Sequence, residues 1–461
     1  MFRTILIANR GEIAVRIMRA CRQMDIRTVA VFSEADAGAS YLRLADRAVC
    51  IGPAPTQRSY GDPAVILLAA EATGAEAIHP GYGFLSENAE FARQVEEAGL
   101  AFIGPPSHVI AMMGDKIAAK RAMLAAGVPC VPGSDGALPS DPAALQALAA
   151  EIGFPLLVKA AAGGGGRGMR VVDRAADLQG AVALTQQEAQ QFFGSPEVYA
   201  ERYLRTPRHV EIQVMCDKHG NAVWLGERDC SSQRRHQKLL EETPAPGIDR
   251  DLVRQVGERC VAACQQIGYV GAGTFEFLFE DGQFNFIEMN TRLQVEHTVT
   301  EAVTGRDLVQ AQIRVAAGES LPWRQDEITS TGHAMECRIN AEDPVSFAPS
   351  PGRITRWNVP GGPYVRFDTH MSAGDTVPRH YDSMVAKLIA HAPTRAEAIR
   401  AMDGALAELQ VEGVLTNRSL HRRILADPDF RAGGVSIHHL ETRLAHWRGE
   451  TTERLDDRRV G

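Results

Sequence analysis

The chain has 461 residues, which at roughly 150 residues per domain predicts about three domains. Apolar residues make up 45% and charged residues 23%, as in globular proteins, which argues against disordered, collagen-like and membrane classes. The formal net charge is −8 and Lys and Arg are spread along the chain, so we expect no nucleic-acid partner.

The chain start and the cysteines bear on the cellular compartment. No apolar run approaches the ~18 residues that span a bilayer, and Asn9-Arg10 follows the first apolar run too soon for a signal peptide. We therefore expect no membrane association and a cytoplasmic location. The cysteines contain no Cys-x-x-Cys pair, and Cys260 and Cys264 are one helical turn apart. This pattern predicts buried free thiols rather than disulfides or a zinc site.

The first hundred residues alternate between strand and helix patterns. An apolar run at residues 4–8 predicts a buried strand, helical spacing follows at 11–18, and a second strand is predicted at 28–32. Such alternation predicts a parallel sheet with helices packed on it. Further strands are predicted at residues 77–79 and 101–104.

The rest of the chain divides at turn and cap signals. Asp115 is a helix-cap residue before a helical stretch at 116–126, and Gly127 ends that stretch. A compact mixture of strand and helix patterns then predicts a small lid, and strand patterns dominate afterwards up to a charged, apolar-poor end. The predicted units of this α/β protein are an N-terminal doubly wound parallel-sheet domain (1–103), a helical connection (104–130), the lid (131–203), a C-terminal mixed α+β domain (204–446) and a flexible tail (447–461).

A glycine-rich segment lies between two strand patterns. Residues 154–160 and 169–172 have strand patterns, and Gly163 to Gly168 between them match G-x-G-x-x-G. A dinucleotide fingerprint opens a helix, whereas a strand follows here, and the chain contains no Walker A string. A hairpin with a glycine tip remains, whose backbone N–H groups can close on phosphate oxygens while Lys159 supplies a positive charge. A flexible surface loop is the alternative.

Two glutamates lie on a predicted hairpin whose register decides their use. Strand patterns at 273–280 and 284–290 flank Asp281-Gly282-Gln283. A two-residue turn would place Glu276 and Glu288 on opposite faces, whereas a three-residue loop would place them opposite each other on one face. Opposed like charges destabilise a sheet unless a cation lies between them. The second register predicts Glu276, Glu288 and Asn290 as oxygen ligands of Mg²⁺ or Mn²⁺, and two unrelated solvated glutamates are the alternative.

Four further segments are rich in polar groups. Arg292 and Glu296 follow the second strand of this hairpin, where one can hold an anion and the other can take a proton. Residues 227–238 form a charge run, whose simplest interpretation is a solvated surface. Residues 333–340 alternate, which predicts a half-exposed strand whose charged residues pair locally. Residues 79–87 are punctuated by Gly and Pro, as is typical of a turn.

Several strings along the chain are specific when taken together. They are Ile7 to Ala14, His79 to Asn88, Lys159 with the Gly163 to Gly168 loop, Gly226 to Ser231, and Glu288 to His297. With these strings the chain resembles the biotin carboxylase family of ATP-grasp enzymes, from residue 7 to about residue 444. The resemblance implies an ATP-grasp fold with a mobile glycine-loop lid, and a ligase that uses ATP to carboxylate biotin with bicarbonate.

The resemblance also implies roles for individual residues. It implies that ATP is surrounded by Lys116, Lys159, Gly165, Gly166, Met169, Glu201, Arg202, Leu204, His209, Gln233, His236, Leu278 and Ile437. It implies that bicarbonate is held by Lys238, Arg292, Gln294, Val295 and Glu296. Glu296 would be the base, Tyr82, Gly83 and Arg338 would line the biotin site, and Arg292, Glu296, Lys238 and Arg338 would be the catalytic residues. The implied magnesium ligands are Glu276, Glu288 and Asn290, in agreement with the second hairpin register.

The family's reaction sets further expectations. Bicarbonate attacks the γ-phosphate of ATP, and the resulting carboxyphosphate releases CO₂ and phosphate beside biotin; positioning and charge neutralisation dominate such a phosphoryl transfer. No Met-Lys dipeptide occurs in the chain, so biotin is expected to arrive on a biotin carboxyl carrier protein. A carboxyltransferase subunit and a homodimer are the other implied partners, and the final acceptor stays open among acetyl-CoA, propionyl-CoA, pyruvate and others.

Two rival functions are compatible with parts of the sequence, and two residues depart from the family pattern. Another ATP-grasp ligase would share the nucleotide and metal residues but not the biotin set, and an idle nucleotide-binding regulator would lack the bicarbonate residues. Thr298 stands where the family commonly has proline, and Arg202 where lysine is frequent. Because proline restrains its neighbourhood, Thr298 predicts a looser segment around Glu296.

Overall fold

The computed structural model of the protein describes residues 1–161 and 168–447. Its N-terminal region contains a five-stranded parallel sheet in the order β3-β2-β1-β4-β5, which confirms the predicted alternation of strands and helices. The strand β3 is mostly exposed and lacks an apolar pattern, which is why the sequence did not predict it. The bounds are β1 (Thr4–Ile7), α1 (Gly11–Gln23), β2 (Arg27–Phe32), β3 (Arg47–Cys50), α2 (Pro63–Thr73), β4 (Ala77–His79), α3 (Ala89–Glu97), β5 (Ala101–Phe102) and α4 (Ser107–Gly114).

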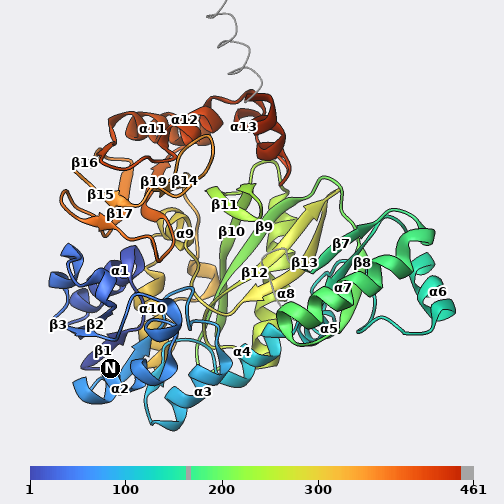
Figure 1. Cartoon of the computed structure of the whole chain (residues 1–461), viewed down its shortest axis with the longest axis horizontal. Coiled ribbons are helices and arrows are strands. Elements are labelled where there is room, and N and C mark those ends of the chain that lie inside the picture. The colour runs from blue at the N-terminus through green and yellow to red at the C-terminus, as the bar shows by residue number, and fades with distance from the viewer. Residues whose placement is uncertain (162–167, 448–461) are drawn as a thin grey trace, which may run out of the picture.

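A helix and a small three-stranded sheet follow. The predicted cap of α5 (Lys116–Ala125) is confirmed, since the Asp115 carboxylate accepts hydrogen bonds from the backbone of Ile117 and Ala118. The sheet has the order β7-β6-β8 and its own apolar core. Figure 1 shows this sheet and its helices at one end of the molecule, with the N-terminal and C-terminal regions together at the other. The bounds are α6 (Pro142–Ile152), β6 (Leu156–Ala160), β7 (Met169–Val172), α7 (Leu178–Phe193) and β8 (Val198–Arg202).

The strands beside the glycine segment pair as a hairpin. β6 and β7 are antiparallel, with Lys159 opposite Met169. This pairing confirms the predicted hairpin up to its tip. The tip itself, with Gly165 and Gly166, lies outside the described residues.

The centre of the molecule is an eight-stranded sheet in the order β13-β12-β9-β10-β11-β14-β19-β17. Every residue of β9 is buried, because strands cover both of its edges and the long helix α8 packs against it and β10. The strands are β9 (Arg208–Cys216), β10 (Ala222–Arg234), β11 (Gln237–Thr243), β12 (Gly271–Glu280), β13 (Gln283–Asn290), β14 (His333–Asn340), β17 (Val365–Thr369) and β19 (Met384–Ala392). The helices are α8 (Arg250–Ile267), α9 (His297–Thr304) and α10 (Leu308–Ala316).

The hairpin β12–β13 places Glu276 opposite Glu288 by a route that the sequence did not predict. Its turn has two residues, Asp281 and Gly282, both with positive φ (51° and 75°), so the predicted three-residue loop is wrong. A bulge at Ile287 then inserts one extra residue between the pairs Phe277↔Phe286 and Glu276↔Glu288. The shift returns the two glutamates to one face.

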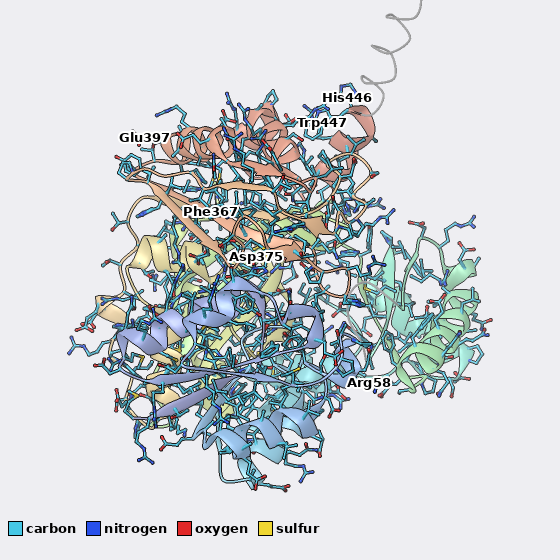
Figure 2. All side chains as sticks on the ribbon, turned by 60° about the vertical axis from the view of Figure 1, so that its left-hand side comes forward. Arg58, Phe367, Asp375, Glu397, His446 and Trp447 are labelled. Atoms are coloured by element: carbon cyan, nitrogen blue, oxygen red, sulfur yellow. The ribbon has the colours of Figure 1, made fainter. Side chains whose placement is uncertain are left out.

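The C-terminal region packs on the edge of the central sheet and on the N-terminal region. Figure 2 shows Asp375 where these two regions meet, and its carboxylate accepts hydrogen bonds from the backbone and hydroxyl of Ser40 (3.1 and 2.6 Å). Trp447, predicted as the first residue of the tail, is buried in the core, and residues 448–461 lie outside the described range. The remaining elements are β15 (Gly352–Arg353), β16 (Arg356–Asn358), β18 (Thr376–Val377), α11 (Arg395–Glu408), β20 (Gln410–Glu412), α12 (Arg418–Ala426) and α13 (Pro428–Ala432).

Two predictions about surface and burial can be compared with this fold. Of the helices in the described ranges, none combines the length and apolar character needed to cross a bilayer. Six of the eight cysteines are buried as predicted, while Cys130 is half-buried and Cys50 is exposed. All eight are free thiols.

Candidate active site

A cavity of about 980 Å³ lies where the N-terminal region, the small sheet and the central sheet meet. Every predicted site residue that the structure describes lines this cavity. Those that the resemblance assigns to ATP are Lys116, Lys159, Met169, Glu201, Arg202, Leu204, His209, Gln233, His236, Leu278 and Ile437. Those that it assigns to the metal, bicarbonate and biotin are Tyr82, Gly83, Lys238, Glu276, Glu288, Asn290, Arg292, Gln294, Val295, Glu296 and Arg338.

Lys238 is the centre of a buried charge cluster. It lies on β11, and its Nζ is 2.6 Å from Glu211, 2.9 Å from Glu276 and 2.7 Å from Glu296. Burial alone would lower the pKa of Lys238, but the three carboxylates outweigh burial and raise the pKa well above its ordinary value. One ammonium group therefore organises three acids from three different segments.

Glu296 is held between two cations. Its Oε1 contacts Lys238, and its Oε2 accepts a hydrogen bond of 2.9 Å from Arg338 on β14. Arg338 also donates to Glu241 at 2.6 Å. Burial opposes ionisation of Glu296, but Lys238, Arg338 and the buried Arg228 outweigh it and hold the pKa well below its ordinary value. Glu296 is therefore an ionised carboxylate, and Arg338 does not pair locally along its strand as the simplest interpretation predicted.

Arg292 approaches the cluster from the segment after β13. Its guanidinium donates to Glu87 at 2.9 Å and to Asn290 Oδ1 at 2.9 Å. Glu87 ends the string that begins at His79, so this contact joins a turn of the N-terminal region to the metal-binding hairpin. Arg292 is only one-fifth exposed, and its guanidinium borders the cavity near Glu296.

The charge run at residues 227–238 is buried from Glu227 to Gln233 and exposed only at its turn, residues 235–237, which corrects its interpretation as a solvated surface for the first part of the run. Arg228 is fully buried and donates to Glu211 at 2.5 Å, to Gln213 at 2.7 Å and to Gln294 at 2.6 Å. The run continues through a turn at Arg235 and His236, both with positive φ (47° and 64°), a conformation that costs side-chain-bearing residues about 1 kcal/mol or more. This strained turn reverses the chain so that Gln233, His236 and Lys238 all line the cavity.

The nucleotide end carries its own cations. Glu201 on β8 accepts hydrogen bonds from Lys159 at 2.6 Å and from Lys120 at 3.0 Å. Burial and the neighbouring Lys159 lower the pKa of Lys116, although Glu288 opposes them. Lys116 and Lys159 both line the cavity. Two ammonium groups that face one cavity favour an anionic occupant such as a polyphosphate.

The biotin-set residue Tyr82 lies at the far end. Its hydroxyl donates to Glu12 at the start of α1, and burial followed by the charge of Glu12 raises the pKa of Tyr82 well above its ordinary value. Arg338 lines the same part of the cavity. The neutral phenol and the guanidinium together form a polar pocket with one fixed positive charge.

The residues present fit a hard divalent cation. Glu276 lies directly opposite Glu288, and Thr274 opposite Asn290, so the three predicted ligands share one face. Within the described residues Glu288 accepts no hydrogen bond. Burial and the charge of Glu276 raise the pKa of Glu288. The two opposed acids and Asn290 offer only oxygen atoms as metal ligands, and the cavity beside them carries cations that can bind phosphate. This combination matches the chemistry of Mg²⁺ bound together with a nucleotide.

Several residues of the site were missed by the sequence analysis. Glu211 and Gln213 alternate with His209 on β9, and that period of two was a signal that a polar face exists there. Glu241 and Lys120 had no such signal. Lys120 occupies an ordinary helix position, and Glu241 follows Leu239 and Leu240 directly.

Comparison with known proteins agrees with the geometry. Three family descriptions match the chain: the biotin carboxylase N-terminal domain over residues 1–110, the ATP binding domain of the carbamoyl-phosphate synthase L chain over 115–324, and the biotin carboxylase C-terminal domain over 336–442. A biotin carboxylase of Haemophilus influenzae is 57% identical over 444 residues, which are 96% of this chain and 99% of the relative.

Solved structures give the same relationship. The biotin carboxylase–beta-gamma-ATP complex from Campylobacter jejuni matches with a TM-score of 0.92 and 47% identity, over 96% of this chain and 99% of that one. The biotin carboxylase domain dimer of Hydrogenobacter thermophilus 2-oxoglutarate carboxylase, in complex with MgADP, ADP and bicarbonate, matches with a TM-score of 0.90 and 47% identity, over 96% and 98%. The chain therefore belongs to the biotin carboxylase family, the ATP-grasp ligases that carboxylate biotin with ATP and bicarbonate.

Proposed function

We propose that the chain performs the family's reaction on a biotin that arrives on a separate carrier protein, and that the cluster around Lys238 is where bicarbonate is activated. The observation that carries this proposal is the convergence of Lys238, Arg338 and Glu296 beside the opposed acids Glu276 and Glu288. A base, two anion-binding cations and a metal-binding pair in one cavity suit a transfer of phosphate to a small oxyanion.

The nucleotide is bound and oriented by a cation of the small sheet, Lys159 on β6, and by one at the start of α5, Lys116. Lys159 and Lys116 face the cavity and are placed to neutralise phosphate oxygens, with Glu201 holding Lys159 in position. Glu276, Glu288 and Asn290 would hold Mg²⁺, which neutralises the charge of the terminal phosphates when it is bound. The protein's own contribution is to align the γ-phosphate with the bicarbonate site.

Bicarbonate is bound and deprotonated by the central cluster. Arg292 and Lys238 attract the anion, and Glu296 accepts its proton while a bicarbonate oxygen attacks the γ-phosphorus and the bond to the β-γ bridging oxygen breaks. In the cluster as it stands, Lys238 divides its charge among three carboxylates. An incoming bicarbonate takes part of that charge, which raises the pKa of Glu296 and improves it as a base.

Carboxyl transfer follows at the other end of the cavity. Carboxyphosphate breaks at its carbon–oxygen bond into CO₂ and phosphate, the phosphate takes the proton of the biotin nitrogen, and that nitrogen attacks CO₂. The guanidinium of Arg338 is placed to stabilise the negative charge on the ureido oxygen of biotin.

The proposed partners are those that the family uses. The chain is proposed to act on a biotin carboxyl carrier protein and to deliver carboxybiotin to a carboxyltransferase. A homodimer is the proposed assembly, by analogy with the domain dimer of the Hydrogenobacter thermophilus enzyme. Pull-down with a biotinylated carrier would identify the carboxyltransferase and hence the final acceptor.

An assay of ADP release tests the proposed function. With Mg²⁺, ATP and bicarbonate the purified chain should release ADP, free biotin should accelerate the release, and omission of bicarbonate should stop it. ADP release that ignores biotin but responds to an amine acceptor would favour the rival ligase. No ADP release at all would favour the idle regulator.

A further inference from the structure

Lys387 is a buried cation on β19, next to the catalytic cluster but outside the cavity wall. It is 0% exposed and pairs directly opposite Arg338 on the neighbouring strand β14. Like charges opposed across a sheet repel each other and destabilise the pair. Arg338 is compensated by Glu241 and Glu296, so Lys387 requires counter-charges of its own.

Two carboxyl groups from different segments lie near Lys387, and Glu12 is the closer of the two. The Nζ of Lys387 is 3.4 Å from Glu12 on α1 and 4.0 Å from Glu336 on β14. Burial alone would lower the pKa of Lys387, but Glu12, Glu336 and Asp368 outweigh it and raise the pKa above its ordinary value. The group is therefore a charged ammonium with no access to solvent.

The shortest contact of this ammonium is to the backbone of the catalytic segment. Nζ donates to the carbonyl oxygen of Val295 at 2.6 Å, a charge-assisted hydrogen bond. That carbonyl belongs to the planar peptide unit that ends at the nitrogen of Glu296. Holding the oxygen therefore fixes the orientation from which the Glu296 side chain leaves the backbone.

The same ammonium also reaches the biotin end of the cavity. Glu12, which lies beside Lys387, accepts the hydrogen bond of the Tyr82 hydroxyl through the same oxygen, Oε1. The bicarbonate segment and the biotin-site tyrosine are thus both connected to one side chain, by Val295 on one side and by Glu12 on the other. Neither tie involves a contact of Lys387 with substrate.

We propose that Lys387 is a positioning residue that aligns the Glu296 base and the Tyr82 phenol with each other through Val295 and Glu12. The inference rests on the proposed function, because Lys387 would position the groups that activate bicarbonate and bind biotin. A misplacement of about 1 Å in such a site costs on the order of 100-fold in rate.

The test compares K387M with K218M in the full-length chain. Lys218 is a control for the hydrogen bond alone, since its Nζ also donates to a backbone carbonyl, that of Ala316 at 2.9 Å, but the residue is exposed and lies outside the cavity wall and the cluster. For K387M we expect kcat for bicarbonate-dependent ADP release to fall about 100-fold and the KM for biotin to rise about tenfold, with the KM for ATP within twofold of wild type. K218M should match wild type in all three constants.

A double-mutant cycle identifies the route of the effect. If Lys387 acts on biotin through Glu12 and Tyr82, the rise in biotin KM in K387M combined with Y82F should be smaller than the product of the two single effects. If the two single effects multiply instead, Lys387 does not act on biotin through Glu12.

A second variant guards against misfolding, because K387M leaves Glu12 with a buried, unpaired charge. K387M combined with E12Q removes both charges and should restore the cooperative unfolding transition while kcat stays about 100-fold low. A folded variant of either kind with kcat within threefold of wild type would overturn the inference. Failure of the wild-type chain itself to release ADP would instead overturn the proposed function.

Discussion

Glu276 lies directly opposite Glu288, yet the two carboxylates are bound very differently. Oε1 of Glu276 accepts hydrogen bonds from Lys238, Asn290 and Gln294 (2.9, 2.8 and 2.8 Å), whereas Glu288 accepts none from the described residues. Burial opposes ionisation of Glu276, but Lys238 and His209 outweigh it and hold the pKa well below its ordinary value, while burial and Glu276 raise the pKa of Glu288. Glu288 is thus the acid that has most to gain from a cation.

E288Q should separate stability from metal binding. Removing one of two opposed charges relieves repulsion, so we expect the variant without ligand to unfold at the same or a higher temperature than wild type. Its stabilisation by MgADP should need at least about tenfold more Mg²⁺. Thermal unfolding across a Mg²⁺ titration measures both effects. E258Q, on the exposed face of α8, is the control and should behave as wild type.

The buried acids Glu241 and Glu336 make stability depend on pH. They pair across β11 and β14, are fully buried, and each keeps one oxygen without a hydrogen bond among the described residues. Burial raises the pKa of Glu336 to about 8 and that of Glu241 to about 7. Because the folded state keeps a proton that the unfolded chain has already lost, the free energy of unfolding should fall as pH rises from about 4.5 towards 8.

E336Q should weaken that dependence, since glutamine cannot ionise. Each retained proton contributes about 1.4 kcal/mol per pH unit within this window. Urea unfolding at pH 5.5 and pH 7.5 should therefore show a smaller loss of stability in E336Q than in wild type. Equal losses in the two proteins would mean that Glu336 is ionised throughout.

Arg338 should matter for biotin more than for ATP. Its guanidinium contacts Glu296 and Glu241 and lines the end of the cavity opposite the nucleotide. In R338Q we expect biotin-dependent kcat to fall by about 100-fold or more, with the KM for ATP within twofold of wild type. R356Q, which removes an exposed arginine on β16, provides the comparison and should be unaffected. A similar loss of ATP affinity in R338Q would contradict the assignment.

The side chain of Thr298 is held by a hydrogen bond, in contrast to the looser segment that the sequence predicted. Its hydroxyl donates to the buried Glu336, so the segment after Glu296 has an anchor where the family commonly has proline. T298V should lower the free energy of unfolding by about 1–3 kcal/mol, because Glu336 loses its donor, whereas T298S keeps the hydroxyl and should cost less than about 1 kcal/mol. Urea unfolding of the two variants makes the comparison, and equal costs would assign the loss to the methyl group instead.

Local patterns predicted those parts of the fold that neighbouring residues determine. The strand and helix spacing of residues 4–32, the Asp115 cap and the strand at residues 333–340 each depend on contacts within a few residues, and each is present. The half-exposed character predicted for that last strand is wrong, because β14 has no exposed residue. The bulge at Ile287 was not predictable, because an apolar β-branched residue inside a strand carries no turn signal. The correct face of Glu288 was therefore predicted for the wrong reason.

Long-range pairing accounts for the rest of what was missed. Lys387 sits in an apolar run, and only its position opposite Arg338 and beside Glu12 shows why a charge is tolerated there. Arg228 likewise has partners that come from four other segments of the chain, so its run resembled an exposed surface.

The central claim is that a bicarbonate oxygen attacks the γ-phosphorus of ATP in the cluster around Lys238 and Glu296. Turnover with bicarbonate labelled with ¹⁸O, followed by mass analysis of the released phosphate, measures this step directly. The account predicts one ¹⁸O atom in each phosphate formed, and the same result at a much lower rate in E296Q. Phosphate that takes its new oxygen from water would contradict the account.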